Sequence, residues 1–427
     1  MSPSAAAPTP RLHYAWVIAA IAFFLLLVAA GVRAASGVLI LPLESEFGWS
    51  RATISAAAAV SIFLYGFTGP FSAAMMQSYG IKRTLLGAML LLAVATASSL
   101  MMTQPWQLML TWGVMVGFGA GTASLPLASA IVNRWFIAHK GLVTGLLTAS
   151  MAAGQLVFLP TLAYLGEHHG WRPVVVAVTI AAIVIALGTL LLREHPADIG
   201  SPPLGGSRIE PPPPPSAGNP ILTAFRALIE VRASRDFWLL AVTFFICGLS
   251  TSGLVAVHFI AYCFDNGISQ TRGAALLAFI GVFNVIGTTV SGWLTDRWDS
   301  RWLLFWYYGL RGLSLLFLPY TGFDAVSLTV FAVFYGLDWV ATVPPTVRLA
   351  TDSYGKQKGP IVFGWLLAIH QLGGAIAAFG AGFMRTALES YIQAFIVSGL
   401  ACLAAAAMAL AISGGGRRPA RPATAAA

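Results

Sequence analysis

Charged residues are scarce in this chain. Only 9% of its 427 residues are Asp, Glu, Lys or Arg, whereas 58% are hydrophobic. About a quarter of the residues of a soluble domain are charged, so this composition cannot cover a surface that faces water. The scarcity of charge excludes a soluble globular protein and predicts that lipid surrounds most of the chain.

Cysteine is also scarce, and the sequence lacks the usual motifs of enzymes. The three cysteines, Cys247, Cys263 and Cys402, fit neither a zinc site nor a disulfide framework. No phosphate-binding loop, nucleotide fingerprint or Ser-His-Asp pattern is present. Glu167-His168-His169 resembles a metal site, but no further ligands cluster near it in the sequence. We therefore expect no enzyme activity, no catalytic residues, no metal site and no cofactor.

The chain does contain long apolar stretches. A stretch of about 20 apolar residues is long enough to cross the hydrocarbon core as a helix. The stretches do not alternate with the period of two that a membrane β-barrel needs, so we expect an all-α membrane protein. Twelve transmembrane helices are expected, at residues 16–42, 52–75, 84–103, 106–132, 142–165, 172–192, 237–262, 272–294, 302–320, 325–348, 360–385 and 391–412.

The second six spans repeat the first six at a constant offset of 219 residues. Segment 145–154 aligns with segment 364–373, and Pro126 aligns with Pro345. Because a proline inside a helix interrupts it, the two prolines predict matched bends in the fourth and tenth spans. Two tandem six-helix halves are typical of a secondary transporter, whose substrate site lies between the halves near the bilayer midplane. We therefore expect two pseudo-symmetric six-helix bundles.

A long polar break, residues 193–236, separates the two halves. It contains several prolines, including the run Pro211–Pro215, and such a segment buries little apolar area. We expect a mostly disordered or polyproline II linker on the cytoplasmic side. Within it, residues 221–235 have apolar residues at helical spacing, which predicts a short helix on the membrane surface. The expected domains are an N-terminal bundle, the linker, a C-terminal bundle and a disordered tail, at residues 1–192, 193–236, 237–412 and 413–427.

The distribution of the basic residues predicts the orientation in the membrane. The formal net charge is +9, which could suggest a nucleic-acid partner. With both termini cytoplasmic, however, the cytoplasmic segments hold seventeen of the 24 Lys and Arg residues and the outer loops hold four. This is the bias that orients membrane proteins. We expect a multi-pass protein of the inner (plasma) membrane, whose basic surface faces anionic membrane lipids and binds no nucleic acid.

A charged turn follows the eighth span. It reads Gly292-Trp-Leu-Thr-Asp-Arg-Trp-Asp-Ser-Arg301 and resembles the Gly-x-x-x-Asp-Arg-x-Gly-x-Arg signature of the major facilitator superfamily, with Asp299 where Gly is usual. In that family this turn stabilises one state of the gate. The alternative is a charged turn that only meets solvent. The resemblance implies gating roles for Gly292, Asp296, Arg297 and Arg301.

Three further segments narrow the resemblance. His13–Val17, Phe47–Arg51 and Asn133–Gly141 are similar to segments of bacterial members related to the monocarboxylate porter family. That family moves small organic acids, often with a proton. The resemblance to the superfamily implies transport by alternating access and favours a monomer. Such members often carry Arg at the position of Thr288, where it can bind the carboxylate of the substrate. Its absence argues against monocarboxylate specificity unless another cation substitutes.

Arg33 is the first candidate for that substitution. Ionisable groups inside a span are energetically unfavourable and therefore mark functional positions. Arg33 lies a little outside the middle of the first span, in the segment Gly31–Gly37, whose small residues leave room for a ligand. A guanidinium stays charged and can bind a carboxylate through two hydrogen bonds. We expect Arg33 to contact the substrate or the gate; a structural ion pair or snorkelling is the alternative.

Three more intramembrane groups are candidates for proton coupling. Asp338 lies near the middle of the tenth span and Arg311 in the ninth, and the two could simply neutralise each other. A carboxylate in low dielectric whose partner changes could instead bind and release a proton. His370, central in the eleventh span, belongs to the residue type that titrates closest to neutral pH. A neutral histidine that bonds two helices together is its alternative.

Four uncharged side chains complete the expected substrate site. Asn284 and Gln155 are mid-span amides, which either bind ligand oxygens or hold helices together. Trp339 and Tyr335 could form apolar walls of the site, although aromatic residues at helical spacing more often belong to the core.

The sequence thus predicts a secondary transporter of a small organic anion, similar to a monocarboxylate, that moves with a proton. Arg33 would attract the carboxylate, Asp338 or His370 would carry the proton, and the turn at Asp296 would close the cytoplasmic gate. Two alternatives stay open. Proton-driven efflux of an amphipathic compound is favoured by the missing Arg at position 288. A non-transporting membrane sensor would need an ordered output element, which the Pro-rich linker does not offer.

Overall fold

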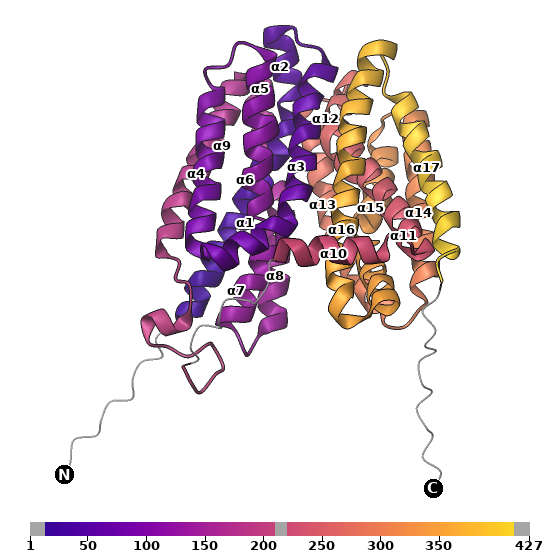
Figure 1. Ribbon diagram of the computed structural model, residues 1–427. Helices are drawn as coiled ribbons and strands as arrows, with labels where there is room; N and C mark the ends of the chain where they lie inside the picture. The colour runs from indigo at the N-terminus through magenta and orange to yellow at the C-terminus, as the bar shows by residue number, and fades with distance from the viewer. Residues whose placement is uncertain (1–12, 210–219, 414–427) are drawn as a thin grey trace, which may run out of the picture.

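The computed structural model describes residues 13–209 and 220–413. Over these residues the structure is helical and contains no strand, only one isolated β-bridge between Phe136 and Leu204. Figure 1 shows the long helices side by side in two groups, one from each half of the chain. We call the end where α1 (Tyr14–Val38) begins and α17 (Ile392–Leu410) ends the inner end, and the opposite end the outer end.

The N-terminal half contains the first six expected spans. In chain order they are α1 with the short α2 (Ile40–Phe47), then α3 (Arg51–Ser78), α4 (Ile81–Ser99), the segmented fourth span α5 (Pro105–Leu108), η1 (Met109–Met115), α6 (Val116–Thr122) and α7 (Leu125–Trp135), then α8 (Lys140–His169), and α9 (Trp171–Gly188) with η2 (Thr189–Leu191).

The C-terminal half contains the other six. They are α11 (Arg235–Gly248) continued by the π-helical η4 (Leu249–Val255) and α12 (Ala256–Asp265), then α13 (Gln270–Thr295), α14 (Ser300–Phe317) with η5 (Leu318–Tyr320), α15 (Ala325–Asp338), α16 (Val343–Leu388) and α17. The chain turns inside α16 at Gly355, where φ is 81°. The residues of α16 before Gly355 finish the tenth span, and those after it form the eleventh.

Ten of these spans are long and apolar enough to cross a membrane by themselves, among the residues described. The remaining two are the fourth span, which is divided into short segments, and the ninth, where α14 carries Arg301 and Arg311. All twelve expected spans are therefore present as helices.

Helix boundaries confirm the internal repeat. α3 and α13 begin at Arg51 and Gln270, and α4 and α14 begin at Ile81 and Ser300, so that each pair starts 219 residues apart. The chain reversals at the outer end repeat as well. Gly48 and Gly267, with φ of 65° and 81°, and likewise Gly170 and Glu389, with φ of 78° and 54°, keep the same spacing.

The fourth and tenth spans are interrupted at matching positions, as the two prolines predict. α6 ends at Thr122 and α7 begins at Leu125, while α15 ends at Asp338 and α16 begins at Val343. In both cases a proline occupies the first turn of the second helix. Proline has no backbone N–H to donate, so it fits there and prevents a continuous hydrogen-bond ladder.

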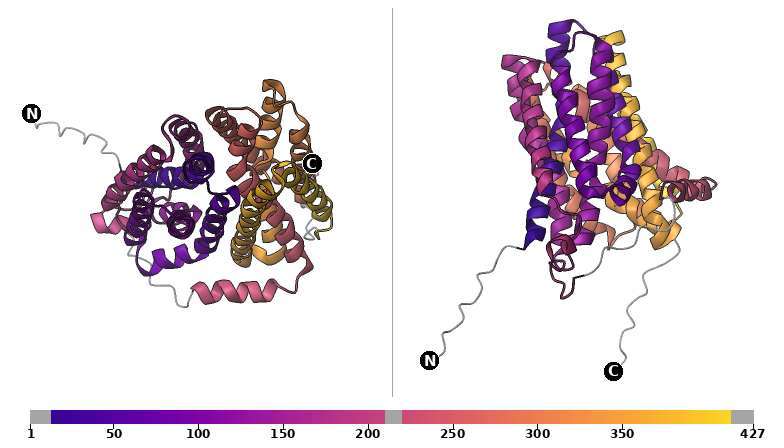
Figure 2. Two further views of the ribbon diagram at one scale, coloured as in Figure 1. Left: turned by 90° about the horizontal axis from the view of Figure 1, so that it is seen from above. Right: turned by 60° about the vertical axis from the view of Figure 1, so that its left-hand side comes forward.

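The two halves meet mainly along two helix pairs, α3 with α16 and α8 with α13. Seen from above in Figure 2, the groups lie next to each other, and α10 (Pro220–Val231) spans them along one edge. At the inner end α10 contacts both halves. The ring of Phe225 lies 6.5 Å from that of Phe71 in α3 and 5.3 Å from that of Trp365 in α16. The helix expected within residues 221–235 is therefore present, and Glu230 holds it to Lys358.

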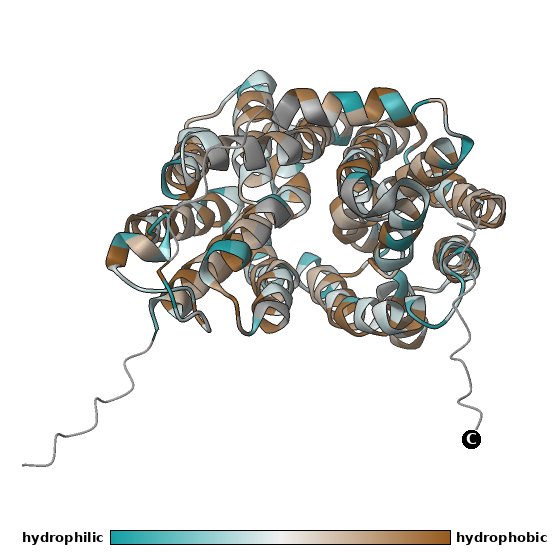
Figure 3. Ribbon diagram, turned by 60° about the horizontal axis from the view of Figure 1, so that its bottom comes forward, coloured by the Kyte–Doolittle hydropathy of each residue, from teal (hydrophilic) through white to brown (hydrophobic). Residues whose placement is uncertain are grey.

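Residues 193–209 are folded, which corrects the expectation of disorder for this part of the linker. The carboxylate of Glu194 accepts hydrogen bonds from the backbone N–H groups of Ile81 (2.7 Å) and Lys82 (2.8 Å) at the start of α4. Helix N-termini have unpaired N–H groups that favour a carboxylate, so this acid anchors the segment. The proline run Pro211–Pro215 and the tail after residue 413 lie outside the described residues. Figure 3, which turns the inner end toward the viewer, shows hydrophilic segments around the helix ends there.

Close packing of α13 against α15 gives a stability prediction with a matched control in the same helix. A Cβ at Gly287 would lie 1.8 Å from the carbonyl oxygen of Leu337, whereas one at Gly281 would meet nothing within 4 Å. We predict that Gly287→Ala destabilises the protein by about 1–3 kcal/mol. Gly281→Ala should be neutral or stabilising, because alanine favours a helix by about 1 kcal/mol over glycine. Thermal unfolding of the detergent-purified protein measures both; equal melting temperatures would contradict the close approach.

Candidate functional site

A small cavity of about 30 Å³ lies between the two halves. Both halves contribute to its lining, which consists of Arg33, Ala34, Ser36, Ile62, Gln155, Leu159, Ser252, Ala256, Val257, Leu277 and Trp339. Arg33, Gln155 and Trp339, which the sequence analysis assigned to the substrate site from three different spans, are therefore brought together here. The position between the halves is the one expected for a substrate site in a two-repeat transporter.

Arg33 provides the positive charge of this cavity. Its guanidinium lies over the ring of Tyr65, 4.7 Å from the ring centroid. None of the ion pairs among the described residues involves Arg33. The alternative role of Arg33, a structural ion pair, is therefore not observed among the described residues. The aromatic ring stabilises the cation through one face and leaves its N–H groups available to an anion.

Asn284 and Tyr335 do not line this cavity. The side-chain oxygen of Asn284 accepts hydrogen bonds from the backbone N–H of Val340 and from the hydroxyl of Thr288, both at 3.1 Å. Tyr335 is fully buried, and its hydroxyl donates to the carbonyl oxygen of Ser250 at 2.8 Å. Both side chains therefore hold helices of the C-terminal half together, which is the alternative that the sequence left open for each.

Arg311 and Asp338 form a buried ion pair at the interruption of the tenth span. The guanidinium Nε lies 2.7 Å from the carboxylate Oδ2, and both side chains are at most 5% exposed. Arg311 also donates through Nη2 to the backbone oxygens of Asp338 (2.6 Å) and Trp339 (3.1 Å). These carbonyls lack helical partners because α15 ends there. One arginine therefore neutralises the acid and completes the broken helix end.

The ion pair continues into a network that reaches His370. Arg311 donates through Nη1 to the sulfur of Cys247 at 2.9 Å, and this thiol interacts electrostatically with the side chain of His370. Oδ1 of Asp338 and Nδ1 of His370 are buried and have no hydrogen-bond partner among the described residues. The two proton candidates thus lie at opposite ends of one polar network. Each has one atom, Oδ1 or Nδ1, that makes no hydrogen bond to a described residue and could bind a proton. The role of Cys247 is not predictable from the sequence, because a lone cysteine with apolar neighbours carries no signal of its partners.

A charged cluster at the outer end joins the two halves. Arg51, the first residue of α3, makes two 2.8 Å hydrogen bonds to the carboxylate of Asp265 at the end of α12, and a third to Glu44. Arg385 donates to the same Asp265 carboxylate at 2.7 Å. The Arg51 side chain is only 6% exposed. We call the pair of Arg51 and Asp265 the outer latch, because it links residues 214 positions apart in opposite halves.

The outer latch is extended by hydrogen bonds inside the C-terminal half. Arg51 Nη1 lies 3.4 Å from the hydroxyl of Tyr391, which is 3.1 Å from Nδ1 of the fully buried His258. Nε2 of His258 in turn lies 2.7 Å from the carbonyl oxygen of Ala378. His258 lies on α12 together with Asp265, and its contacts tie that helix to Ala378 of α16 and to Tyr391 at the start of α17. The latch is therefore part of a larger set of contacts and not a lone surface ion pair.

A second contact between the halves occurs at the repeat-related position. Gln270, which is 219 residues after Arg51 and begins α13, donates to the carbonyl oxygen of Val38 at 2.7 Å. Nearby, the carboxylate of Glu167 accepts a hydrogen bond from the backbone N–H of Thr271 at 2.8 Å. These contacts between the halves were not among the predictions from the sequence. Comparing the first residues of the repeated helices would have identified Arg51 and Gln270 as equivalent.

The charged turn at the inner end makes its contacts within its own half. Asp299 accepts a hydrogen bond from the backbone N–H of Arg301 (2.9 Å) and pairs with its guanidinium, while Arg297 stacks on Trp293 at 4.1 Å. Asp299 therefore caps α14 where the superfamily signature has Gly. Hydrogen bonds from Arg301 hold the pKa of the Asp299 carboxyl below its usual range, so the turn stays charged at neutral pH. A Cβ at Gly292 would meet nothing within 4 Å, and packing does not require glycine there.

The comparisons with known proteins agree with this arrangement. A family model described as Major Facilitator Superfamily matches residues 21–378. The chain belongs to the major facilitator superfamily. It is accordingly a multi-pass membrane transporter and not an enzyme, and its twelve spans form the fold of that superfamily.

Two relatives match nearly the whole length of this transporter. Bovine monocarboxylate transporter 13 is 24% identical over 402 residues, which cover 93% of this chain and 89% of the relative. An uncharacterized MFS-type transporter of Bacillus subtilis is also 24% identical, over 90% of this chain and 91% of its own.

Solved structures show the same fold. A bacterial homologue of the human lysosomal transporter Spinster, in an inward-facing and occupied conformation, superposes with a TM-score of 0.75 at 16% identity and covers 95% of this chain and 97% of its own. A D-xylose–proton symporter superposes with a TM-score of 0.70 at 14% identity, over 94% of this chain and 99% of its own.

Breaking the outer latch should open the outer end of the transporter. In Asp265→Asn the amide keeps the shape of the side chain but lacks the charge that binds Arg51 and Arg385. Hydrogen bonds to charged groups contribute about 1.5–3 kcal/mol each, so the ratio of open to closed outer ends should rise roughly 10- to 100-fold. Distances between spin labels on the exposed positions Thr103 and Gly322, one in each half, measure this.

Glu46→Gln is the matched control for the latch. It removes a carboxylate that pairs with Arg172 at the outer end, but that pair lies within the N-terminal half. The label distances should therefore match those of the unmodified protein. If Asp265→Asn also leaves them unchanged, the latch does not hold the halves together.

Proposed function

We propose that this transporter moves a small organic anion of the monocarboxylate class together with a proton, by alternating access between its two halves. It would act in the plasma membrane with both termini in the cytoplasm. The observation that carries the proposal is Arg33, a cation at a cavity between the halves that forms no ion pair with any described residue.

The chemistry of the cavity supports an anionic substrate. A charge in low dielectric without a counter-ion is unfavourable, so an anion that enters gains the full attraction of Arg33. The planar guanidinium can donate two parallel hydrogen bonds to one carboxylate. Gln155 and Ser252 add uncharged hydrogen-bonding groups, and Trp339 adds an apolar wall. A small acid with one carboxylate and a short apolar body matches this combination of groups, and the halves must separate to admit it, because the cavity of about 30 Å³ is smaller than such an acid.

Arg33 also offers an answer to the missing arginine at position 288. Thr288 donates to Asn284 and is part of the packing between α13 and the interruption of the tenth span. The cation therefore comes from α1, in the other half of the transporter. The names of the relatives support the same substrate class, since several are monocarboxylate transporters at about a quarter identity.

The network from Asp338 to His370 supports proton coupling. A proton that arrives at either group changes the charge balance of the buried Arg311 between them. Such a change favours a different arrangement of the surrounding helices, because a buried charge must keep a partner. The name of the D-xylose–proton symporter, whose fold this chain shares, supports the same kind of coupling.

The first test of the proposal is uptake of labelled short-chain monocarboxylates into proteoliposomes, with and without an inward proton gradient. Gradient-stimulated, saturable uptake is expected. Arg33→Ala should lower kcat/KM for uptake about 10- to 100-fold, the equivalent of about 1.5–3 kcal/mol for hydrogen bonds to a charged group. The kcat/KM of Arg33→Lys should lie between those of Arg33→Ala and the unmodified protein, because lysine keeps the charge but lacks the planar guanidinium.

Arg348→Gln is the control for Arg33. Arg348 pairs with Asp352 one helical turn away, and both side chains are largely exposed, so uptake should not change. Normal uptake by Arg33→Ala would show that Arg33 does not bind the substrate. Transport of lipophilic cations in place of acids would favour the efflux of amphipathic compounds, and an absence of all flux would favour a membrane sensor.

The proton network predicts a second, separable defect. His370→Gln should abolish the stimulation of uptake by a proton gradient but leave exchange of labelled for unlabelled acid intact, since exchange needs no net proton movement. The exposed His169→Gln serves as the control and should behave as the unmodified protein. Asp338→Asn should show the same defect, with lower stability as well, because it leaves Arg311 without its carboxylate. Full gradient stimulation in both variants would exclude this network from coupling.

A further inference from the structure

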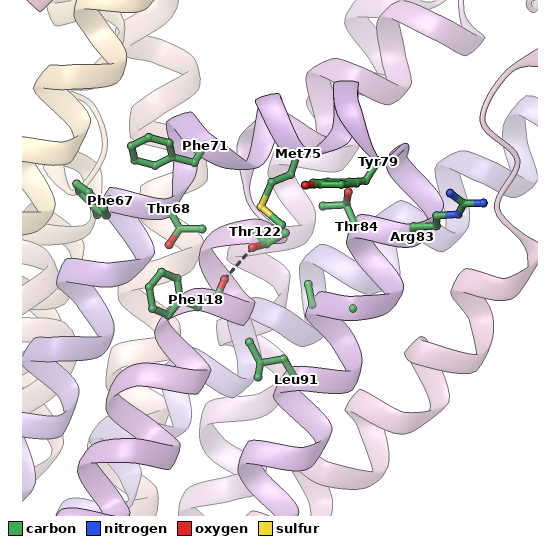
Figure 4. Close-up of a pocket in the computed structure, with 12 residues that line it drawn as sticks. Phe67, Thr68, Phe71, Met75, Tyr79, Arg83, Thr84, Leu91, Phe118 and Thr122 are labelled. Carbon is green, nitrogen blue, oxygen red and sulfur yellow. Dashed lines mark hydrogen bonds between the residues drawn. The ribbon is translucent and has the colours of Figure 1, made fainter. Parts of the chain in front are cut away.

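A second cavity lies inside the N-terminal half, separate from the cavity at Arg33. Its volume is about 730 Å³, within the range of about 300–1,000 Å³ that ligand pockets occupy. Figure 4 shows its lining, which comes from α3, α4 and α6: Phe67, Thr68, Phe71, Met75, Tyr79, Arg83, Thr84, Gly87, Ala88, Leu91, Phe118 and Thr122. Among the residues that the structure describes, none of the C-terminal half lines it, and we call it the lateral groove.

The lateral groove is apolar and open to the surroundings of the protein. Phe67 is 41% exposed, Phe118 is 40% exposed and Met75 is 39% exposed. In a membrane-spanning helix, side chains exposed on the outside of the bundle face hydrocarbon. Acyl chains of the surrounding lipid can therefore enter the groove directly, without crossing water.

Two buried hydroxyls in the groove lack a partner. Thr68 and Thr84 are 5% and 6% exposed, and their Oγ1 atoms make no hydrogen bond with any described residue. Thr122 in the same groove, by contrast, donates to the carbonyl oxygen of Phe118 at 2.9 Å (Figure 4). An unpaired buried hydroxyl is destabilising, so an acceptor on a bound molecule would gain a hydrogen bond at little cost.

The inner mouth of the groove carries an unpaired positive charge. Arg83 is exposed and takes part in none of the ion pairs among the described residues. The neighbouring acid, Glu194, is already occupied by the N–H groups of Ile81 and Lys82 and by Arg134. A ligand with a negative group would therefore find a free guanidinium beside the apolar groove.

We propose that the lateral groove binds one acyl chain of an anionic phospholipid, with its phosphate at Arg83 and an ester oxygen at Thr84. A phospholipid is the molecule that combines a long apolar chain, ester acceptors and a charge in this order. The assignment rests on the orientation in the proposed function, which places Arg83 at the headgroups of the cytoplasmic leaflet. Thr68, deeper in the groove, has no role in this assignment.

The occupant is tested by lipid binding to the purified full-length transporter, measured by native mass spectrometry with phosphatidylglycerol and with phosphatidylethanolamine. A Cβ at Gly87, which lines the groove, would meet nothing within 4 Å, so Gly87→Leu fills the groove without strain. We expect its dissociation constant for phosphatidylglycerol to rise about tenfold, the equivalent of about 1.4 kcal/mol. Gly188→Leu is the matched control, because its Cβ is equally unobstructed and it lies outside the groove.

The headgroup is tested separately. Arg83→Gln should weaken phosphatidylglycerol about fivefold, the equivalent of about 1 kcal/mol for one basic side chain at an anionic headgroup. The same change should leave phosphatidylethanolamine unaffected. Thr84→Val, which keeps the shape and removes the hydroxyl, should weaken both lipids.

Three results would overturn the assignment. They are equal lipid binding by Gly87→Leu and Gly188→Leu, equal binding of the two lipids by the unmodified protein, and binding of a free fatty acid without binding of phospholipid. None of these measurements depends on transport. Failure of the lipid site and failure of the transport proposal would therefore be distinguished.

Discussion

Every backbone polar group inside a bilayer must find its partner within the protein, and the interruption of the tenth span is where this constraint shapes the C-terminal half. Between α15 and α16 the carbonyls of Asp338 and Trp339 and the N–H of Val340 have lost their helical partners. Arg311 supplies donors to both carbonyls, and Asn284 supplies an acceptor to the N–H. The arginine requires a counter-ion in this dry place, which Asp338 provides. The network that we propose for proton coupling therefore includes the residues that complete the hydrogen bonds of the interrupted tenth span.

The two halves consist of equivalent helices, but their charged residues lie at different positions of the repeat. Arg33 and Ser252 are equivalent by the repeat, and both line the central cavity, so the cation stands on one side of it and a small hydroxyl on the other. The repeat equivalent of Asp338 is Gly119, so the first half has no buried acid at that point. The cation proposed to bind the substrate therefore lies in the N-terminal bundle, and the groups proposed to carry the proton lie in the C-terminal bundle. Under that proposal, coupling between substrate and proton has to cross the interface between the two bundles.

The sequence was sufficient to predict what depends on periodicity. Spans, repeat and interruptions follow from hydrophobic length and from proline, and Arg33 stood out because an unpaired charge in a span is rare. The local sequence pattern does not predict whether a polar or aromatic side chain of a span points into the cavity or toward a neighbouring helix. Trp339 reaches the cavity while Asn284, on the neighbouring span, is turned toward the broken helix. The pairing of Arg51 with Asp265 could not be predicted from the sequence for another reason. The two residues are 214 positions apart, and each resembles an ordinary charged residue at a membrane surface.

The outer latch and the central cavity are connected by the helices they share. Arg51 begins α3, and Ile62 of the same helix lines the cavity. Asp265 ends α12, and Ala256 at the start of that helix lines the cavity from the opposite half. A substrate that moves either wall therefore moves one member of the latch relative to the other. Under the proposed function, the two hydrogen bonds between Arg51 and Asp265 are the contact through which occupancy of the cavity would change the outer end.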